Sequence, residues 1–148
     1  MSTRSTVWII AAFAIGAVFV PLRSLDCPAW DVWVADQSGQ PVSGLTVRLT
    51  YQNYSAEQES HEIDATTNAQ GHVAFKAQTR SASLGRRVAA TLRSAAAGVH
   101  ASFGPHASVF AFGNGLQGFA IDNREVIVDW AGKPGHMESR IIVTPRKL

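Results

Sequence analysis

The clearest alternation of apolar and polar positions along the chain lies in residues 29–49. Over residues 29–35 (AWDVWVA) the two sets of alternate positions differ in polarity, which is the two-residue period of a half-buried strand. Residues 36–41 (DQSGQP) hold the residue types that favour a turn. Alternation returns over residues 46–52 (TVRLTYQ), so this stretch predicts two strands joined by a polar turn.

Further segments indicate that strands dominate the chain. Residues 52–64 are polar and predict an exposed loop or an edge strand. Short runs rich in β-branched and aromatic residues predict further strands within residues 66–75, 107–112, 118–121, 125–130 and 140–144. About seven strands at this spacing are typical of a β-sandwich of ~100 residues.

One segment departs from the strand pattern and has a helical period instead. Between residues 81 and 99, apolar side chains recur at every fourth position, namely Leu84, Val88 and Leu92. Alanines fill the positions between them and Gly98 follows as a stop signal, so we expect a helix inserted at about residues 83–97. Three arginines are expected on or near its solvent side: Arg86, Arg87 and Arg93. Such a helix could serve as a lid, bind a partner, or cover an open sheet edge.

The N-terminus is strongly apolar. Residues 7–20 contain no polar side chain, and the uncharged run between Arg4 and Arg23 covers residues 5–22. Its length is at the lower limit for a helix that crosses a bilayer, so we predict an N-terminal hydrophobic helix spanning the membrane at about residues 5–22. Residues 1–26 would then be a signal anchor or a cleaved signal peptide, and the lack of a small-residue cleavage site favours the anchor.

Residues 27–148 are therefore expected to form one exported domain. A short N-terminus followed by a large β-rich domain favours a single-pass protein of the cell membrane with its C-terminal domain outside the cytoplasm. Cleavage of the N-terminal segment would instead give a secreted or periplasmic protein. Cys27 follows the apolar run at the position where a bacterial lipoprotein is lipidated, but residues 24–26 lack the usual lipid-attachment motif, so a free or buried thiol is favoured.

Composition and charge narrow the class of partner. With 46% apolar residues, the chain can bury a core of its own. Its net charge is +2, and without Arg4 and Arg23 the acidic and basic residues number 11 each. A neutral exported domain argues against nucleic acid as a partner. The acidic run at residues 57–64 is expected to be solvated or to meet basic residues within the fold.

Two stretches carry a resemblance to a known family. They are the pattern Val32-x-Val34-x-Asp36-x-x-Gly39-x-Pro41-Val42-x-Gly44-x-x-Val47 and the later Thr67-x-x-x-Gly71-x-Val73-x-Phe75. Over about residues 29–77 the chain resembles the carboxypeptidase regulatory-like domain. The resemblance implies a small Ig-like or transthyretin-like β-sandwich, here with one inserted helix. It also implies an accessory, non-catalytic role at the cell surface, because such domains are modules of exported proteins.

Candidate chemistry is sparse. His100 and His106 bracket a Gly-Pro turn that could bring both imidazoles to one side, so they are candidates for a metal site, although their spacing matches no zinc motif. Ser102 and Ser108 stand close to them, yet no nucleophile-elbow motif is present. No dinucleotide or phosphate-binding motif is present either, so we predict no cofactor and no enzymatic activity.

Binding is therefore the expected activity. Strand tryptophans belong more often to the core than to a surface, but Trp33 remains a candidate for binding a glycan or another envelope protein, together with Arg86, Arg87 and Arg93. We expect a non-catalytic, membrane-anchored binding or structural module of the cell envelope outside the cytoplasm. The alternative is a small metal-binding protein or enzyme that uses the loop containing His100 and His106.

Overall fold

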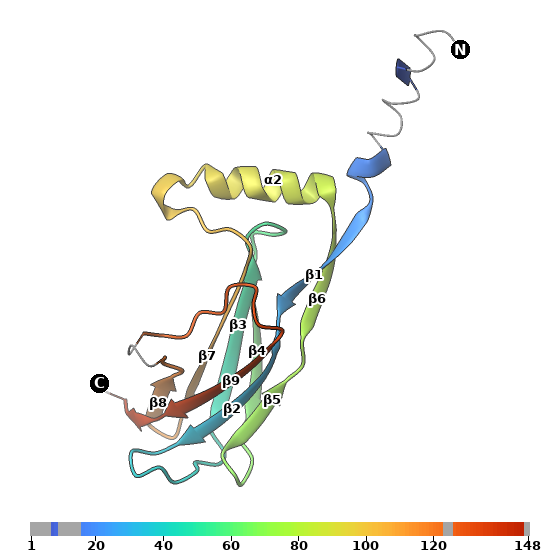
Figure 1. Ribbon diagram of the computed structural model, residues 1–148. Helices are drawn as coiled ribbons and strands as arrows, with labels where there is room; N and C mark the ends of the chain where they lie inside the picture. The colour runs from blue at the N-terminus through green and yellow to red at the C-terminus, as the bar shows by residue number, and fades with distance from the viewer. Residues whose placement is uncertain (1–6, 9–15, 123–125, 147–148) are drawn as a thin grey trace.

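The computed structural model describes residues 7–8, 16–122 and 126–146. Within these ranges the protein is mainly β, as predicted, with the helix α2 inserted between strands (Figure 1). The elements follow in the order β1 (Pro21–Cys27), β2 (Ala29–Ala35), β3 (Thr46–Asn53), β4 (His61–Thr66), β5 (His72–Phe75), β6 (Gln78–Ser83), α2 (Leu84–Ala95), the 3₁₀-helix η1 (Gly98–His100), β7 (Pro105–Gly113), β8 (Leu116–Phe119), β9 (His136–Ile142) and β10 (Thr144–Pro145).

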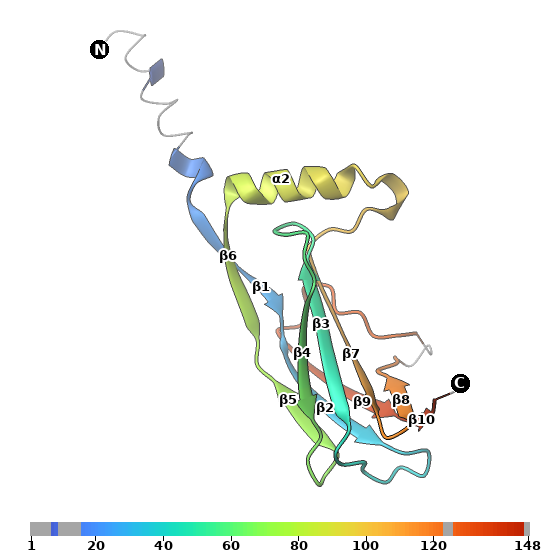
Figure 2. The ribbon, with the colours of Figure 1, turned by 180° about the vertical axis from the view of Figure 1, so that it is seen from behind.

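The described strands form three sheets. The largest has five strands in the order β10-β8-β7-β3-β4, and a second has three in the order β5-β2-β9. Strand β2 pairs antiparallel with β5 and parallel with β9. Figures 1 and 2 view the molecule from opposite sides and show the three-stranded sheet in front of the five-stranded sheet and then behind it. The remaining sheet is a two-stranded pairing of β1 with β6.

Side chains of the two larger sheets share one hydrophobic core. Trp30 and Val32 of β2 lie in the same buried cluster as Val47 and Leu49 of β3, and all four are 0% exposed. Successive strand residues point to opposite faces, so the alternation in the sequence puts these side chains inward. Burial of each large apolar side chain contributes roughly 1.5–3 kcal/mol relative to exposure. The two strands predicted from residues 29–52 are confirmed.

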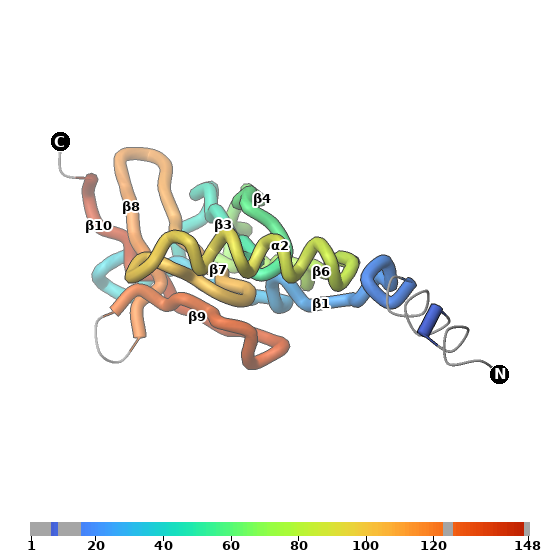
Figure 3. The backbone as a smooth tube through the Cα atoms, turned by 90° about the horizontal axis from the view of Figure 1, so that it is seen from above, coloured from blue at the N-terminus to red at the C-terminus, as the bar shows by residue number. Residues whose placement is uncertain are grey.

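Strands β1 and β6 prolong β2 and β5 beyond the two larger sheets. Only Pro28 separates β1 from β2, and two residues separate β5 from β6. The four strands thus make one long antiparallel ribbon, with a shift of register between Leu25 and Cys27. Helix α2 follows β6 directly and lies across the end of the molecule where the ribbon ends (Figure 3). We call this ribbon-and-helix end the α2 end.

Two sequence predictions are resolved by these elements. The helix expected at about residues 83–97 is confirmed as α2, whose N-cap Ser83 accepts a hydrogen bond from the backbone N–H of Arg86. The strand predicted at 125–130 is wrong, because residues 126–130 make only isolated bridges, from Ile127 to Ile121 and from Trp130 to Ala107. Residue 125 lies outside the described residues.

The predicted membrane span at about residues 5–22 is described only in part, since residues 9–15 lie outside the described ranges. No helix within those ranges is both long enough and apolar enough to cross a bilayer. The last residues of the predicted span, Pro21 and Leu22, belong to β1. Residues 21–26, which the sequence pattern grouped with the N-terminal segment, are therefore part of the β-structure.

Cys27 is enclosed where β1 meets β2. It is 0% exposed, its Sγ lies 3.4 Å from the carbonyl oxygen of Pro28, and burial raises the pKa of its thiol to about 12. A thiol in this position is inert, because the reactive thiolate is disfavoured and reagents have no access. The folded domain thus supports a buried thiol rather than a lipidated one.

Candidate functional site

The two histidines proposed as a metal pair have different surroundings. His100 ends η1 and is exposed. His106 is half-buried, with Nδ1 2.8 Å from Asp129 Oδ2 and Nε2 3.2 Å from the carbonyl oxygen of Phe103. The described part of the chain holds no group of three or more His, Cys, Asp or Glu side chains that could bind a metal ion. The geometry therefore gives the metal-site hypothesis no support.

A cavity of about 260 Å³ opens beside His106 and Asp129, and Ser102 and Ser108 also line it. These are the residue types of a nucleophilic triad, in which the histidine Nε2 accepts the serine proton. Here Nε2 faces the carbonyl oxygen of Phe103, which can only accept a hydrogen bond. The Asp129 carboxylate contacts Nδ1, so both ring nitrogens of His106 are engaged by groups other than a serine hydroxyl. The cavity is better suited to binding than to acyl transfer.

Two of the three arginines of α2 contact the rest of the domain. The Arg87 guanidinium donates to the carbonyl oxygen of Leu22 at 2.8 Å and to Ser24 Oγ at 3.0 Å. Arg86 Nε donates to the carbonyl oxygen of Ala56 at 3.3 Å. The expected position on or near the solvent side is confirmed for Arg86 and Arg93, which are exposed, whereas Arg87 is half-buried. Arg86 and Arg87 also fasten the helix to backbone carbonyls.

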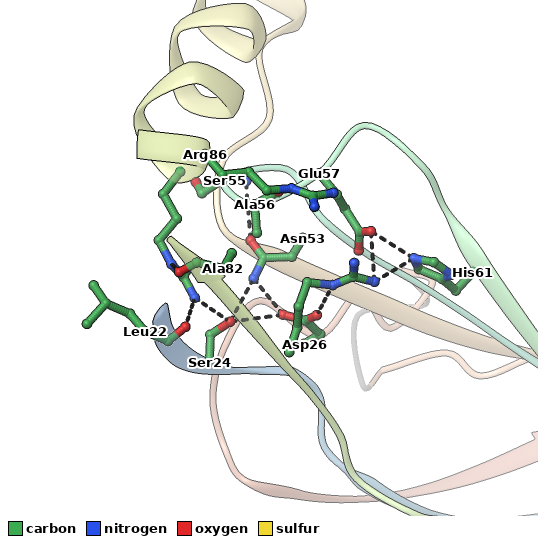
Figure 4. A network of polar contacts seen from close by, with 12 residues as sticks. Leu22, Ser24, Asp26, Asn53, Ser55, Ala56, Glu57, His61, Ala82 and Arg86 are labelled. Atoms are coloured by element: carbon green, nitrogen blue, oxygen red, sulfur yellow. Dashed lines mark hydrogen bonds and ion pairs between the residues drawn. The ribbon is translucent and has the colours of Figure 1, made fainter. Parts of the chain in front are cut away.

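Beneath α2 lies a group of polar side chains that we call the polar cluster (Figure 4). It comprises Asp26 of β1, Asn53 of β3, Glu57, His61 of β4 and Arg80 of β6. Asp26 accepts from Asn53 Nδ2 at 2.7 Å and from Arg80 Nε at 2.9 Å. The same guanidinium lies 2.8 Å from Glu57 Oε2. One cation thus joins the carboxylates of two buried residues, which ties β1 and β6 to the loop after β3.

One ring nitrogen of His61 contacts two other members of the polar cluster. His61 Nε2 lies 2.9 Å from Glu57 Oε2 and 2.8 Å from a terminal nitrogen of Arg80. That ring nitrogen either donates to the carboxylate or accepts from the guanidinium, so only one contact at a time is a hydrogen bond. Glu57 Oε1 is buried and has no hydrogen-bond partner among the described residues. The cluster therefore joins β1, β4 and β6 beneath α2 and leaves one buried carboxylate oxygen without a hydrogen bond among the described residues.

The tryptophans divide between the core and one surface. Trp30 and Trp130 are buried, as expected for strand tryptophans, and their ring N–H groups donate to Ser139 Oγ and to the carbonyl oxygen of Pro134. Trp33 is 39% exposed, and its ring centroid lies 5.0 Å from that of His72. A shallow cavity of about 360 Å³ adjoins it, lined in part by Gly39, Pro41 and Arg140. Trp33 thus remains available for binding.

A surface cavity on the five-stranded sheet escaped the sequence prediction. It measures about 420 Å³ and is lined by aromatic rings of β7 and β8 between two arginines, the set being Phe110, Phe112, Phe119, Leu116, Arg48 and Arg146. We call it the aromatic groove. The Phe110 centroid lies 5.5 Å from that of Phe112 and 5.7 Å from that of Phe119. The two-residue spacing of Phe110 and Phe112 was the available signal, since it puts both rings on one sheet face.

The groove's polar border is fixed by ion pairs. The Arg48 guanidinium lies 5.4 Å from the centre of the Phe112 ring, in cation–π contact. It also contacts Glu62 at 2.7 Å and makes two hydrogen bonds to Asp64, at 2.7 and 2.8 Å. Part of the acidic run therefore meets arginine within the fold, as expected. Arg48 lowers the pKa of Asp64 through this hydrogen bonding.

Comparison of the sequence with family models and with curated proteins finds no match. The functional proposal therefore rests on the geometry of these surfaces and on the character of the N-terminal segment.

Proposed function

We propose that this protein is a non-catalytic, membrane-anchored binding module that presents the aromatic groove outside the cytoplasm. The observation that carries the proposal is the groove itself. Three phenylalanine rings line one opening of about 420 Å³, and Phe119 is 47% exposed. Aromatic side chains beside arginine are the residues that most often anchor protein partners, because they bury much area at small entropic cost. The favoured ligand is therefore another envelope protein.

The N-terminal part of the fold supports retention of the apolar segment. Strand β1 begins at Pro21, directly after the apolar run, and pairs with β6 along its length. Cleavage after residue 26 would remove β1 and with it Asp26, which lies at the centre of the polar cluster. An anchor that stays attached keeps this support intact, and a signal peptide would have to be removed before β1.

The proposed fold is the small Ig-like or transthyretin-like sandwich that the family resemblance implied. It is supported by two sheets that share one core and by the turn glycines of the shared pattern. Gly39 and Gly71 have φ of 84° and 69°, values that favour glycine. A carboxypeptidase regulatory-like relationship is consistent with an accessory role and gives no reason to expect catalysis.

Site-specific crosslinking of the full chain in its native membrane tests this function. A photoreactive phenylalanine analogue in place of Phe119 should give one reproducible adduct, whose mass identifies the partner. The same analogue at Gln37, in an exposed turn outside the groove, is the matched control and should give none. A Phe112→Glu substitution should abolish the adduct at position 119. Equal adducts at both positions, or none at 119, would contradict a binding role for the groove.

The alternative is a small enzyme or metal-binding protein that uses the loop containing His100 and His106. The contacts of His106 are what keep it testable, although they include no metal-binding group among the described residues. His106 and Asp129 are paired at 2.8 Å in a cavity that two serines also line. Stoichiometric metal in the purified full chain, lost on His106→Ala, would establish the alternative. Partner binding that persists in His106→Ala would show that His106 has no role in that binding.

A further inference from the structure

Helix α2 has its apolar face turned away from the domain. Leu84, Val88 and Leu92 follow one another at four-residue spacing and form a single stripe. They are 42%, 52% and 66% exposed, whereas the one buried residue of the helix is Ala90. An amphipathic helix on a globular domain normally packs its apolar stripe inward. Among the described residues nothing buries this stripe.

Polar contacts fix the helix in this orientation. Three of its side chains donate to the backbone of the domain: Arg86 to the carbonyl of Ala56, Arg87 to that of Leu22, and Ser94 to that of Tyr54 at 3.0 Å. Arg86 and Arg87 lie in the first turn of α2 and Ser94 in its last turn, so the helix is held at both ends. Rolling the stripe inward would break all three and leave carbonyl oxygens without donors.

The stripe is continuous with the end of the N-terminal apolar run. A Cβ placed on Gly85, in the first turn of α2, would lie 2.7 Å from Val18 Cγ1, so the two backbones approach closely. Phe19 and Val20 follow and are 72% and 50% exposed. Figure 3 shows the N-terminal segment leaving the molecule beside the first turn of α2. An apolar surface therefore extends from the stripe onto the segment that we propose to enter the membrane.

The charge at this end of the molecule complements an anionic surface. Helix α2 carries Arg86, Arg87 and Arg93 and no acidic residue. Arg23 of β1 is exposed at the same end. The acidic groups beneath the helix, Asp26 and Glu57, are buried and already contact a cation. An apolar face bordered by arginines is the pattern of helices that lie in a bilayer interface.

We infer that α2 lies along the surface of an anionic lipid bilayer, with Leu84, Val88 and Leu92 inserted at the boundary of headgroups and acyl chains. The inference rests on the proposed membrane anchorage and adds a second contact to it. The two larger sheets extend away from α2 in Figure 1, so this contact sets the domain upright and holds the aromatic groove clear of the lipid.

The test uses the full chain in vesicles of phosphatidylcholine and phosphatidylglycerol. Val88→Cys and Leu92→Cys each accept an environment-sensitive fluorophore. Gln37→Cys, in the exposed turn that follows β2, provides the matched control. The end of β2 that leads into this turn lies far from α2 (Figure 1). Cys27 stays unlabelled because it is buried. A nitroxide carried on the lipid chains should quench the labels at 88 and 92 several-fold more than the label at 37. Replacing the phosphatidylglycerol with phosphatidylcholine should weaken docking of α2, and Arg93→Gln should lower the docking equilibrium constant roughly fivefold.

Each result has a distinct meaning. Flotation with the vesicles, together with no lipid quenching at 88 and 92, would overturn the inference and leave anchorage intact. Labels shielded from aqueous iodide but not quenched from the lipid would show a second copy or another protein on the stripe, which also overturns it. Protein that fails to float would refute the anchorage and this inference together. Near-ultraviolet circular dichroism from Trp30 and Trp130 verifies that every variant is folded.

Discussion

Replacing Arg80 with methionine should destabilise the domain strongly. The guanidinium contacts Asp26, Glu57 and His61 at 2.8–2.9 Å, and methionine keeps most of the side-chain length while removing the charge. Two carboxylates would then remain buried without a cation. Because they come from β1 and from the loop that precedes β4, their repulsion would act directly on the attachment of the ribbon.

The magnitude follows from burial. Removing one partner of a buried ion pair costs about 3–5 kcal/mol, because the remaining charge is left unsolvated. The Asp26 and Glu57 side chains are 2% and 3% exposed, but that of Arg80 is 27% exposed, so water reaches one side of the cluster. We therefore expect about 3 kcal/mol, the lower end of that range. With a urea slope of ~1–3 kcal/mol per molar, the unfolding midpoint should fall by roughly 1–3 M.

Urea unfolding of the full chain in detergent micelles, followed by tryptophan fluorescence, measures this loss. Arg48→Met is the matched control, since Arg48 also joins two carboxylates but does so in solvent, and its substitution should cost much less. Asp26→Asn combined with Arg80→Met should cost less than the sum of the two single variants, because the shared contact is lost only once. If Arg80→Met and Arg48→Met lower the midpoint equally, the cluster does not hold the ribbon by charge.

Three further outcomes are expected. Cys27, whose pKa burial raises to about 12, should resist alkylation of the native protein at pH 8 and react only on unfolding, as mass spectrometry would record. Arg48 lowers the pKa of Asp64 from its ordinary value of 3.8, so this pair stabilises the fold above that value and loses its effect as pH falls through the lower folded-state pKa. Urea midpoints of Asp64→Asn should therefore depend less on pH below about 4 than those of the wild type. Gly71→Ala should lower the stability by at least about 1–3 kcal/mol, because φ is 69° and the new Cβ would lie 2.4 Å from the carbonyl oxygen of Val34; thermal unfolding measures it.

Strands with a clear two-residue period could be predicted because one of their faces is buried. The alternation in β2 and β3 reflects a core on one side and solvent on the other, and the structure has both strands within a residue of the predicted bounds. Residues 126–130 have equally high β-propensity, yet their only pairings are isolated bridges. Propensity describes how a segment fits a pleated surface, whereas a ladder needs a neighbour with free backbone groups.

Strands β1 and β6 escaped the sequence prediction because the pairing that makes them strands is distant in the sequence. Residues 21–26 follow an apolar run and are grouped with it by the sequence pattern, and Gln78–Ser83 is polar except for Ala82. Neither segment carries a core-facing alternation of its own. What makes them strands is mutual pairing across more than 50 residues, such as Leu22 with Ala82, together with the ion pair of Asp26 and Arg80. A pairing at that separation leaves no local pattern in the sequence.

The sequence also identified a single site residue without the distant residues that contact it. His106 was found because it stands beside a turn with a second histidine, but the partner that orients it, Asp129, is 23 residues away and carries no motif. The aromatic groove combines Phe110 and Phe119 across a hairpin with Arg48 from the neighbouring strand. Of these residues only His106 was a candidate from the sequence, because the sheet register that brings the groove residues to one opening leaves no local pattern.

Helix α2 shows most directly what periodicity leaves undetermined. The spacing of Leu84, Val88 and Leu92 predicts an apolar stripe, and the same stripe would suit a protein core or a lipid surface. The other face of the helix decides between them, because the end of the domain beneath α2 offers backbone carbonyl oxygens such as that of Leu22. Carbonyl oxygens need donors, and Arg86 and Arg87 supply them, so the arginine side of the helix faces the domain. The stripe is thereby turned outward, next to the apolar run that leads into β1, where a bilayer is the surface that suits both.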